Sequence, residues 1–280
     1  MKNSMKKIGA TVLALVLAAT TLPTQNAKAA EVGSYELSDT KVNTNYDVTG
    51  DGVKDKIEFD KINHNGSYYC ALDVKINGEV ALNVEDTEYG RLEPVFIQTK
   101  DHGYILICAY HDNDYQTISR IYEYVDGKLK ERMNLDNIAG KVYYQYSSNV
   151  YATKEDYFQI RFDGQTNMLA KTKMIFKLKV GTEGKLSVAN KTVAVYYSNK
   201  RMSDAKNYTS KYLTAAKKIQ AYRSSTGTKK AFSIKKGTKL KITKVSVQGS
   251  AARYYCVTKS GKKGWIKSKI NLFKDLMYAG

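Results

Sequence analysis

Hydrophobic and polar residues alternate along much of the chain after residue 30. Runs in which every second residue is apolar predict half-buried strands, and clear examples are residues 121–125, 142–146, 157–162 and 174–180. Two connections carry Asn77-Gly78 and Asp126-Gly127, the pairs preferred in type I′ hairpin turns. The pattern predicts an all-β protein, in which residues 30–190 form an antiparallel β-rich domain, either a sandwich or part of a propeller.

The pattern changes twice after this domain. A short helix is expected only over residues 204–218, between the two modules, where residues 191–215 are expected to form a linker. Over residues 216–275, shorter alternating runs are separated by glycine-containing turns, which is typical of a small β-barrel.

The first 29 residues have the pattern of an export signal. Three lysines in the first seven residues precede an apolar run at 8–22, and Ala27-Lys28-Ala29 follows. A basic start, an apolar centre and an A-x-A cleavage site define a signal peptide, here a helix that is expected to be removed. A transmembrane anchor needs about 20 apolar residues and is disfavoured. The mature protein is therefore expected to be secreted, either extracellular or held non-covalently at the cell wall.

Charge divides the chain more sharply than hydrophobicity does. The whole sequence has 45 Lys+Arg and 27 Asp+Glu, a net charge of +18. Residues 31–190 hold 19 basic and 25 acidic side chains, a net of −6, whereas residues 191–280 hold 22 basic and two acidic ones, a net of +20. Because a summed positive potential attracts polyanions, the basic segment is expected to face an anionic partner. The acidic domain is expected to have a different, unidentified protein partner.

The cysteines argue against a disulfide-built scaffold and a zinc site, and they leave the pairing of Cys70 with Cys108 open. Three are too few for a disulfide-built scaffold. Cys70 and Cys108 both lie in strand-like runs, so they can pair in an exported protein if their strands are neighbours, or they remain as buried thiols. No Cys-x-x-Cys or Cys/His ligand spacing occurs, so a zinc site has no support.

An Asp/Gly-rich segment at 47–58 is the sharpest chemical motif of the acidic domain. Calcium loops place side-chain oxygens at the first, third, fifth and ninth positions, glycine at the sixth, a carbonyl at the seventh and a carboxylate at the twelfth. The corresponding ligands here are Asp47, Thr49, Asp51, Asp55, the carbonyl of Val53, and Glu58. A β-turn without metal is the alternative.

This segment also resembles the Asp-x-x-Gly-Asp-Gly-x-x-Asp loops of FG-GAP and VCBS-type repeats, in which such a loop precedes a strand. That resemblance implies bound Ca²⁺. The sequence departs from the family pattern at Thr49, where Asp or Asn is usual, and in having a single convincing copy.

The basic segment resembles bacterial SH3 (SH3b) domains. The matching pieces are Tyr222-Arg223-Ser224, Lys236-Gly237-Thr238 and the run 261–266, which ends in Gly264-Trp265-Ile266. The resemblance covers residues 216–275 and implies an extracellular binding module, often directed at the cell wall, without chemistry of its own. Departures are Tyr254, where the family often has Trp, and a longer turn at 247–252.

Aromatic side chains beside basic ones are the expected ligand contacts of this module, because their faces stack on sugars or peptides. They are Tyr222, Tyr254, Tyr255 and Trp265, with Arg223 beside them. A core position for Trp265, directly after a glycine of a small barrel, is the alternative.

These features favour a secreted, non-catalytic binding or adaptor protein whose basic module binds an anionic cell-wall polymer or a peptidoglycan peptide. The alternative is a cell-wall hydrolase, or a hydrolase-associated protein, with an unrecognised carboxylate site in residues 31–190. None of His64, His102 and His111 lies in a recognisable catalytic motif. Charge alone motivates nucleic-acid binding, and export makes a specific nucleic-acid partner unexpected.

Overall fold

The computed structural model describes residues 31–276, apart from 64–65, 67, 86, 112–115, 140–142, 167, 170, 199–209, 249–250 and 275. The signal peptide predicted at 1–29 lies outside these residues. Every strand pairing is antiparallel, and the helical elements of the described chain are α1 (Asp136–Ala139) and a 3₁₀ turn, η1 (Thr182–Gly184). The prediction of an all-β protein is confirmed. No helix in the described part of the chain is long and apolar enough to cross a membrane.

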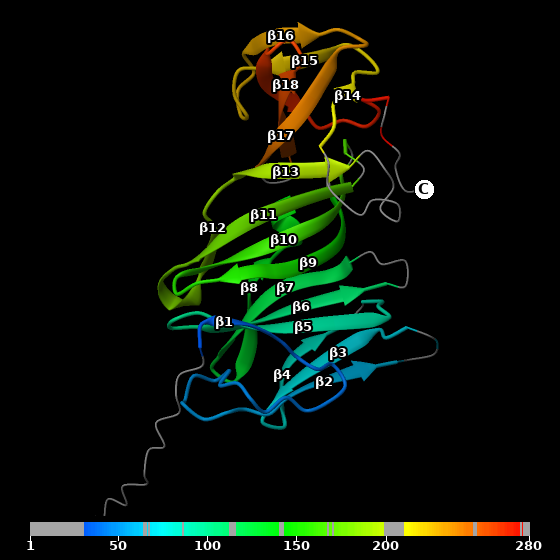
Figure 1. Ribbon diagram of the computed structural model, residues 1–280. Coiled ribbons are helices and arrows are strands. Elements are labelled where there is room, and N and C mark those ends of the chain that lie inside the picture. The colour runs from blue at the N-terminus through cyan, green and yellow to red at the C-terminus, as the bar shows by residue number, and fades with distance from the viewer. Residues whose placement is uncertain are drawn as a thin grey trace, which may run out of the picture.

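Two sheets are formed by the first half of the chain, and Figure 1 shows them as successive layers. The lower sheet has the order β2-β3-β4, with β2 (Ile57–Ile62), β3 (Ala71–Ile76) and β4 (Glu79–Val84). The middle sheet has the order β1-β5-β6-β7-β8, with β1 (Gly33–Glu36), β5 (Arg91–Gln98), β6 (Gly103–Tyr110), β7 (Gln116–Val125) and β8 (Lys128–Asn134).

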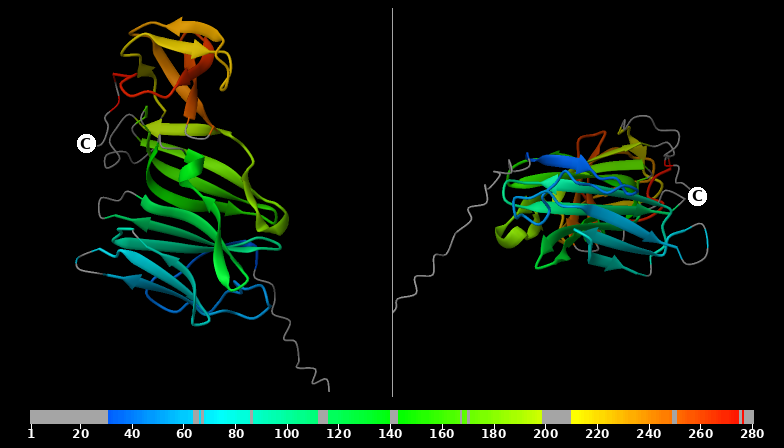
Figure 2. Two further views of the ribbon diagram at one scale, coloured as in Figure 1. Left: turned by 180° about the vertical axis from the view of Figure 1, so that it is seen from behind. Right: turned by 90° about the horizontal axis from the view of Figure 1, so that it is seen from below.

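The third sheet, called the long sheet below, has eleven strands. Its main order is β16-β15-β19-β18-β17-β13-β11-β10-β9, while β12 pairs with β11 and β14 with β17. The strands are β9 (Tyr143–Thr153), β10 (Tyr157–Thr166), β11 (Lys171–Val180), β12 (Leu186–Val188), β13 (Thr192–Ser198), β14 (Leu213–Thr214), β15 (Ile219–Tyr222), β16 (Lys230–Ile234), β17 (Lys239–Gln248), β18 (Ala251–Thr258) and β19 (Lys263–Lys267). Figure 2 shows the same succession of layers from behind.

The middle sheet is covered on both faces, which explains the nearly continuous hydrophobic sequence of β6. Ile105 and Ile107 belong to a core shared with the lower sheet. Tyr104 and Leu106, which alternate with them, belong to a second core shared with β9–β13. Because successive side chains of a strand point to opposite faces, both sets of β6 residues must be apolar.

Both predicted hairpin turns are confirmed. Asn77 and Gly78 have φ angles of 53° and 89°, and Asp126 and Gly127 have 52° and 79°. Type I′ turns require positive φ at both central residues, which Asn, Asp and Gly tolerate best. These turns fix the registers of β3 with β4 and of β7 with β8.

The two described ends of the region expected to be a linker contain strands of the long sheet. β13 occupies Thr192–Ser198, and the described residues 210–218 contain the short strand β14 and no helix, while 199–209 lie outside the described residues. Val193, Val195 and Tyr197 are buried at 8%, 3% and 0% exposure. This period of two fits a strand with one face on the core, so β13 joins the two halves of the chain.

β17 is a long strand of ten residues. The long turn expected at 247–252 is largely a hairpin, because Val247 pairs with Ala252 and Gln248 with Ala251. β17 therefore extends beyond β14, which pairs with its start, and reaches β13, which pairs with residues 244–246. The core of the C-terminal strands is continuous with that of β9–β13.

Candidate binding face

A row of outward-facing side chains crosses four neighbouring strands of the long sheet. Tyr222 on β15 pairs with Trp265 on β19, Trp265 pairs with Tyr255 on β18, and Tyr255 pairs with Lys244 on β17. The ring centroids of Tyr255 and Trp265 are 5.1 Å apart, at an interplanar angle of 59°. The neighbouring residues in sequence point inward and are buried: Ala221, Val245, Tyr254 and Ile266.

Basic side chains flank this row on both sides. Arg253 pairs with Lys267 on one side, and their charged groups lie over the Tyr222 ring, 4.7 Å and 5.6 Å from its centroid. Arg253 also donates a hydrogen bond of 2.6 Å to the carbonyl of Gly227. On the other side, Lys241 and Lys263 both pair with Val257 and complete a second basic row. We call Tyr222, Arg253, Tyr255, Trp265 and Lys267 the barrel patch.

The positive charge of this segment is not neutralised from within it. The acidic residues after 190 are Asp204 and Asp275, and both lie outside the described residues. The described strands β13–β19 therefore contain lysine and arginine without a single carboxylate. Clustered like charges on one surface produce a summed potential that attracts polyanions.

The structure brings three of the five predicted ligand residues together and places the other two elsewhere. Tyr222, Tyr255 and Trp265 come together on the outer face, as described above. Tyr254 is 1% exposed and belongs to the core, so its assignment to a surface groove is wrong, because alternation turns it away from Tyr255. Arg223 is exposed in the loop after β15, and the guanidinium that stacks on Tyr222 belongs to Arg253.

Gly264 explains why Trp265 lies outside the core. A Cβ atom on Gly264 would lie 3.1 Å from the Cβ of Ala221 and 3.2 Å from a ring carbon of Phe232. Gly264 is therefore the inward-facing residue, and it is packed so closely that its neighbours would have to shift to accept a side chain. Trp265, the next residue, is half-buried on the opposite, outer face.

Sequence reasoning missed Arg253 and Lys267. Each lies two residues from an aromatic residue of the row, Arg253 before Tyr255 and Lys267 after Trp265. A spacing of two places side chains on the same face of a strand, so this signal was present in the sequence.

The Asp/Gly loop is held by its own hydrogen bonds. Asp55 is 2% exposed and accepts bonds from the amides of Val48 and Thr49, at 2.6 Å and 2.8 Å, and from the side-chain amide of Asn77, at 2.6 Å. Asp55 thereby fastens the loop to the β3–β4 turn.

Two other predicted calcium ligands, Asp47 and Asp51, also accept hydrogen bonds from backbone amides of this loop. Asp47 accepts bonds from the amides of Gly50 and Gly52, and Asp51 from that of Val53, while Glu58 lies in β2. Within the described residues, no three His, Cys, Asp or Glu side chains converge closely enough to hold a metal ion. The prediction of calcium therefore rests on the sequence of the loop.

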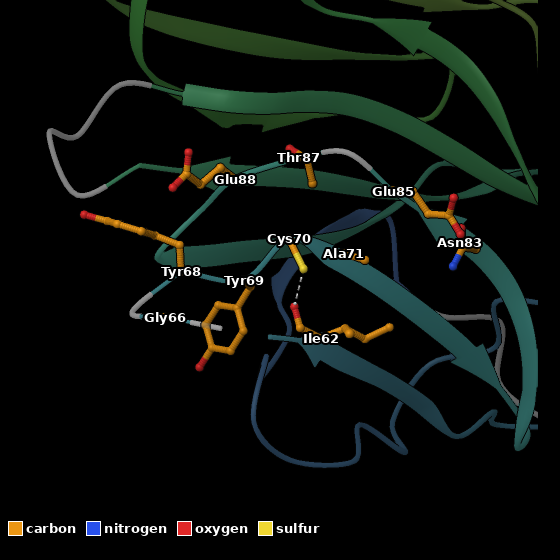
Figure 3. Close-up of a pocket in the computed structure, with 10 residues that line it drawn as sticks. All are labelled: Ile62, Gly66, Tyr68, Tyr69, Cys70, Ala71, Asn83, Glu85, Thr87 and Glu88. Carbon is orange, nitrogen blue, oxygen red and sulfur yellow. Dashed lines mark hydrogen bonds between the residues drawn. The ribbon is translucent and has the colours of Figure 1, made fainter. Parts of the chain in front are cut away.

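The lower and middle sheets (residues 31–140) are called the acidic half below. A cavity of about 730 Å³ opens in it, between the end of β2, the start of β3 and the segment after β4 (Figure 3). Tyr68, Tyr69 and Cys70 line it, together with the carboxylates Glu85 and Glu88. If the protein is a hydrolase, this cavity is large enough for its carboxylate site. It is equally large enough for a ligand of the acidic half.

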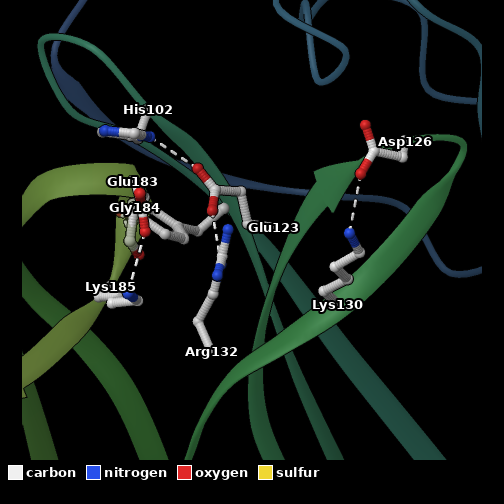
Figure 4. A network of polar contacts seen from close by, with 9 residues as sticks. His102, Glu123, Asp126, Lys130, Arg132, Glu183, Gly184 and Lys185 are labelled. Atoms are coloured by element: carbon white, nitrogen blue, oxygen red, sulfur yellow. Dashed lines mark hydrogen bonds and ion pairs between the residues drawn. The ribbon is translucent and has the colours of Figure 1, made fainter.

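A partly buried network of polar side chains joins the middle sheet to the turn after β11 (Figure 4). Glu123, 8% exposed, accepts a hydrogen bond of 2.6 Å from Nε of Arg132 and lies 2.6 Å from Nδ1 of His102. A Cβ atom on Gly184, which has a φ of 67°, would lie 2.2 Å from the Glu123 carboxylate. The three side chains and the glycine fit together as a structural contact between layers.

None of the three cysteines forms a disulfide bond. Cys108 faces the core on the β9–β13 side of the middle sheet, whereas Cys70 lies at the cavity beside the lower sheet. Burial raises the pKa of Cys108 and that of Cys256 to about 12, so both stay protonated at neutral pH. A thiol rather than a thiolate is a poor nucleophile.

No protein-family model, curated protein or solved structure matches this chain.

Proposed function

We propose that this is a secreted, non-catalytic binding protein whose barrel patch binds an anionic polymer of the cell envelope. The observation that carries the proposal is the aromatic row of Tyr222, Trp265 and Tyr255, flanked by basic rows, in a segment whose described residues lack any acid. Aromatic faces stack on apolar ring faces, and the flanking cations take up the negative charge.

We also propose the finer domain assignments made from the sequence. An SH3b-like barrel for β14–β19 is supported by the order β16-β15-β19-β18-β17 and by turn glycines Gly237 and Gly261, which have φ angles of 84° and 85°. The stacked lower and middle sheets favour the sandwich over the propeller alternative for the acidic half. Glu85 and Glu88 give the cavity of this half a negative charge.

Co-sedimentation of the mature chain with purified cell walls tests the function. Wild type is expected in the pellet at low ionic strength and in the supernatant at high salt, because screening weakens charge attraction. The variant Arg253→Gln/Lys267→Gln is expected to remain in the supernatant, whereas Lys54→Gln/Lys56→Gln, which removes two exposed lysines of the acidic half, is the matched control. Wild type that stays in the supernatant at low salt would overturn the proposal.

Turbidity of the same suspension decides the hydrolase alternative. A binding protein leaves the turbidity constant, whereas a wall hydrolase lowers it. Clearing that is lost in Glu85→Gln or Glu88→Gln would assign chemistry to the cavity and contradict the non-catalytic proposal.

A further inference from the structure

The outer face of the long sheet continues beyond the barrel patch. Lys244 of β17 pairs with Ala194 of β13, and Tyr196 of β13 pairs with Lys173 of β11. Paired residues of neighbouring antiparallel strands lie on the same face of a sheet. The row that contains Tyr255 therefore passes through β13 onto β11.

β11 and its neighbours carry a second group of lysines beside tyrosines. Nζ of Lys177 lies 3.4 Å from the ring centroid of Tyr157, and Nζ of Lys173 lies 5.5 Å from that of Tyr196, which is 47% exposed. These side chains alternate with the buried residues Thr172, Met174, Phe176 and Leu178. We call Tyr157, Lys173, Lys177, Lys179 and Tyr196 the sheet patch.

The boundary of charge coincides with the long sheet and not with the predicted domain boundary. Residues 31–140, which form the lower and middle sheets, hold 11 basic and 21 acidic side chains, a net of −10. Residues 141–280, which contain the long sheet, hold 30 basic and six acidic ones, a net of +24. Asp163 of β10 is one of these acids, and it is paired with Arg161. The two patches therefore belong to one positively charged sheet.

We infer that a single flexible, linear polyanion is bound across the strands from β15 to β11, over the barrel patch and the sheet patch together. This inference rests on the proposed function and extends it. Six neighbouring strands, β15, β19, β18, β17, β13 and β11, span about 24 Å at roughly 4.8 Å per strand. Affinity is therefore expected to rise with polymer length until the polymer covers this distance.

The shape of the sheet favours a flexible occupant over a rigid one. Neighbouring strands are rotated by about 20–25°, and Figure 1 shows β17 rising steeply from β13. The face therefore winds, and a phosphate-linked single chain can follow it whereas a nucleic-acid duplex cannot. Charge complementarity and the tyrosine faces together specify a polymer of repeating anions.

The test compares inorganic polyphosphate fractions shorter and longer than the span of the six strands, titrated calorimetrically into the full mature chain. The variant Lys173→Gln/Lys177→Gln is expected to weaken binding of the long fraction at least fivefold and to leave the short fraction unchanged. Arg253→Gln/Lys267→Gln is expected to weaken both fractions, and the control Lys54→Gln/Lys56→Gln neither. Circular dichroism spectra of all variants establish that they are folded.

The outcomes separate the two proposals. If the long fraction binds Lys173→Gln/Lys177→Gln as tightly as wild type while the barrel-patch variant loses binding, the extended path is wrong and the proposed function stands. If neither variant alters binding, both are wrong. A DNA duplex that binds as tightly as polyphosphate of equal charge, with the same dependence on Lys173 and Lys177, would overturn the choice of a flexible occupant.

Discussion

At the scale of single residues, Asp55 holds the first loop of the acidic half in place. Its buried carboxylate accepts bonds from Val48, Thr49 and Asn77. Asp55→Ala leaves these donors without their acceptor, and unsatisfied buried groups cost about 1–3 kcal/mol each. We expect the free energy of unfolding, measured with urea, to fall by about 3 kcal/mol. Asp51→Ala, which loses only the bond from Val53, is the control, and an equal loss in both variants would contradict this role.

Calcium binding by the same loop is a separate prediction. Millimolar calcium is expected to raise the Tm of the wild-type chain, because a ligand that binds only the folded state stabilises it. Asp51→Ala removes a predicted side-chain ligand without disturbing the buried Asp55, so its Tm should not respond. A wild-type Tm that is the same in calcium and in chelator would show that the loop is a turn without metal.

The cysteines give a prediction about pH. Cys108 and Cys256 have pKa values raised by burial to about 12, so the folded chain holds their protons more tightly than the unfolded chain, in which a thiol has a pKa of about 8.5. Their contribution to stability is complete below about pH 8.5 and is lost as pH rises toward 12. Urea unfolding at increasing pH is expected to show this decline.

Thiol labelling at pH 8 provides the companion measurement. Cys70 lines the cavity and is partly exposed, so it is expected to react in the native protein, whereas Cys108 and Cys256 should react only after unfolding. Rapid labelling of all three thiols in the native state would contradict the burial argument.

At the scale of elements, the contact between Glu123 and Gly184 links the middle sheet to the turn between β11 and β12. Gly184→Ala is expected to destabilise the fold by more than 1 kcal/mol, because its φ is positive and the added Cβ meets a carboxylate held by Arg132 and His102. Gly127→Ala, which has a positive φ but open space around it, separates the cost of backbone strain from that of the clash. Equal thermal unfolding of the two variants would show that the contact contributes nothing.

The elements that the sequence predicts best are those fixed by local chemistry. The predicted hairpin turns form at Asn77-Gly78 and Asp126-Gly127, and the alternating runs at 157–162 and 174–180 lie in β10 and β11. β13 was missed because its strand pairs with partners distant in sequence, β11 and β17, and its own residues give only a short pattern. Local propensity is a weak guide where tertiary pairing decides the outcome.

The sequence predicted only part of the candidate face, because strand pairing decides which side chains share that face. Residue type alone grouped Tyr254 with Tyr255, and only the strand register shows that one is core and the other surface. Arg253 and Lys267 follow from that register, whereas Arg223, adjacent to Tyr222 in sequence, does not share its face. A period of two, applied to every aromatic residue of β15, β18 and β19, would have found the row.

At the scale of the whole molecule, the sign of the net charge follows the division of the chain into sheets. The lower and middle sheets carry a net negative charge and the long sheet a net positive one, and Figure 1 shows the lower sheet at one end of the stack, the strands β14–β18 at the other and the middle sheet between them. A polyanion is therefore expected to contact the chain only along the long sheet, which leaves the cavity of the acidic half accessible to a second partner.

The salt dependence of wall binding tests the central claim most directly. If the barrel patch binds an anionic polymer, Arg253→Gln/Lys267→Gln should reduce the slope of log K against log salt concentration by about two, roughly one per lost ionic contact. Tyr255→Ala/Trp265→Ala should lower K at every salt concentration and leave the slope unchanged, because stacking releases no ions. If both variants bind walls with the affinity and slope of the wild-type chain, the barrel patch is not the binding face.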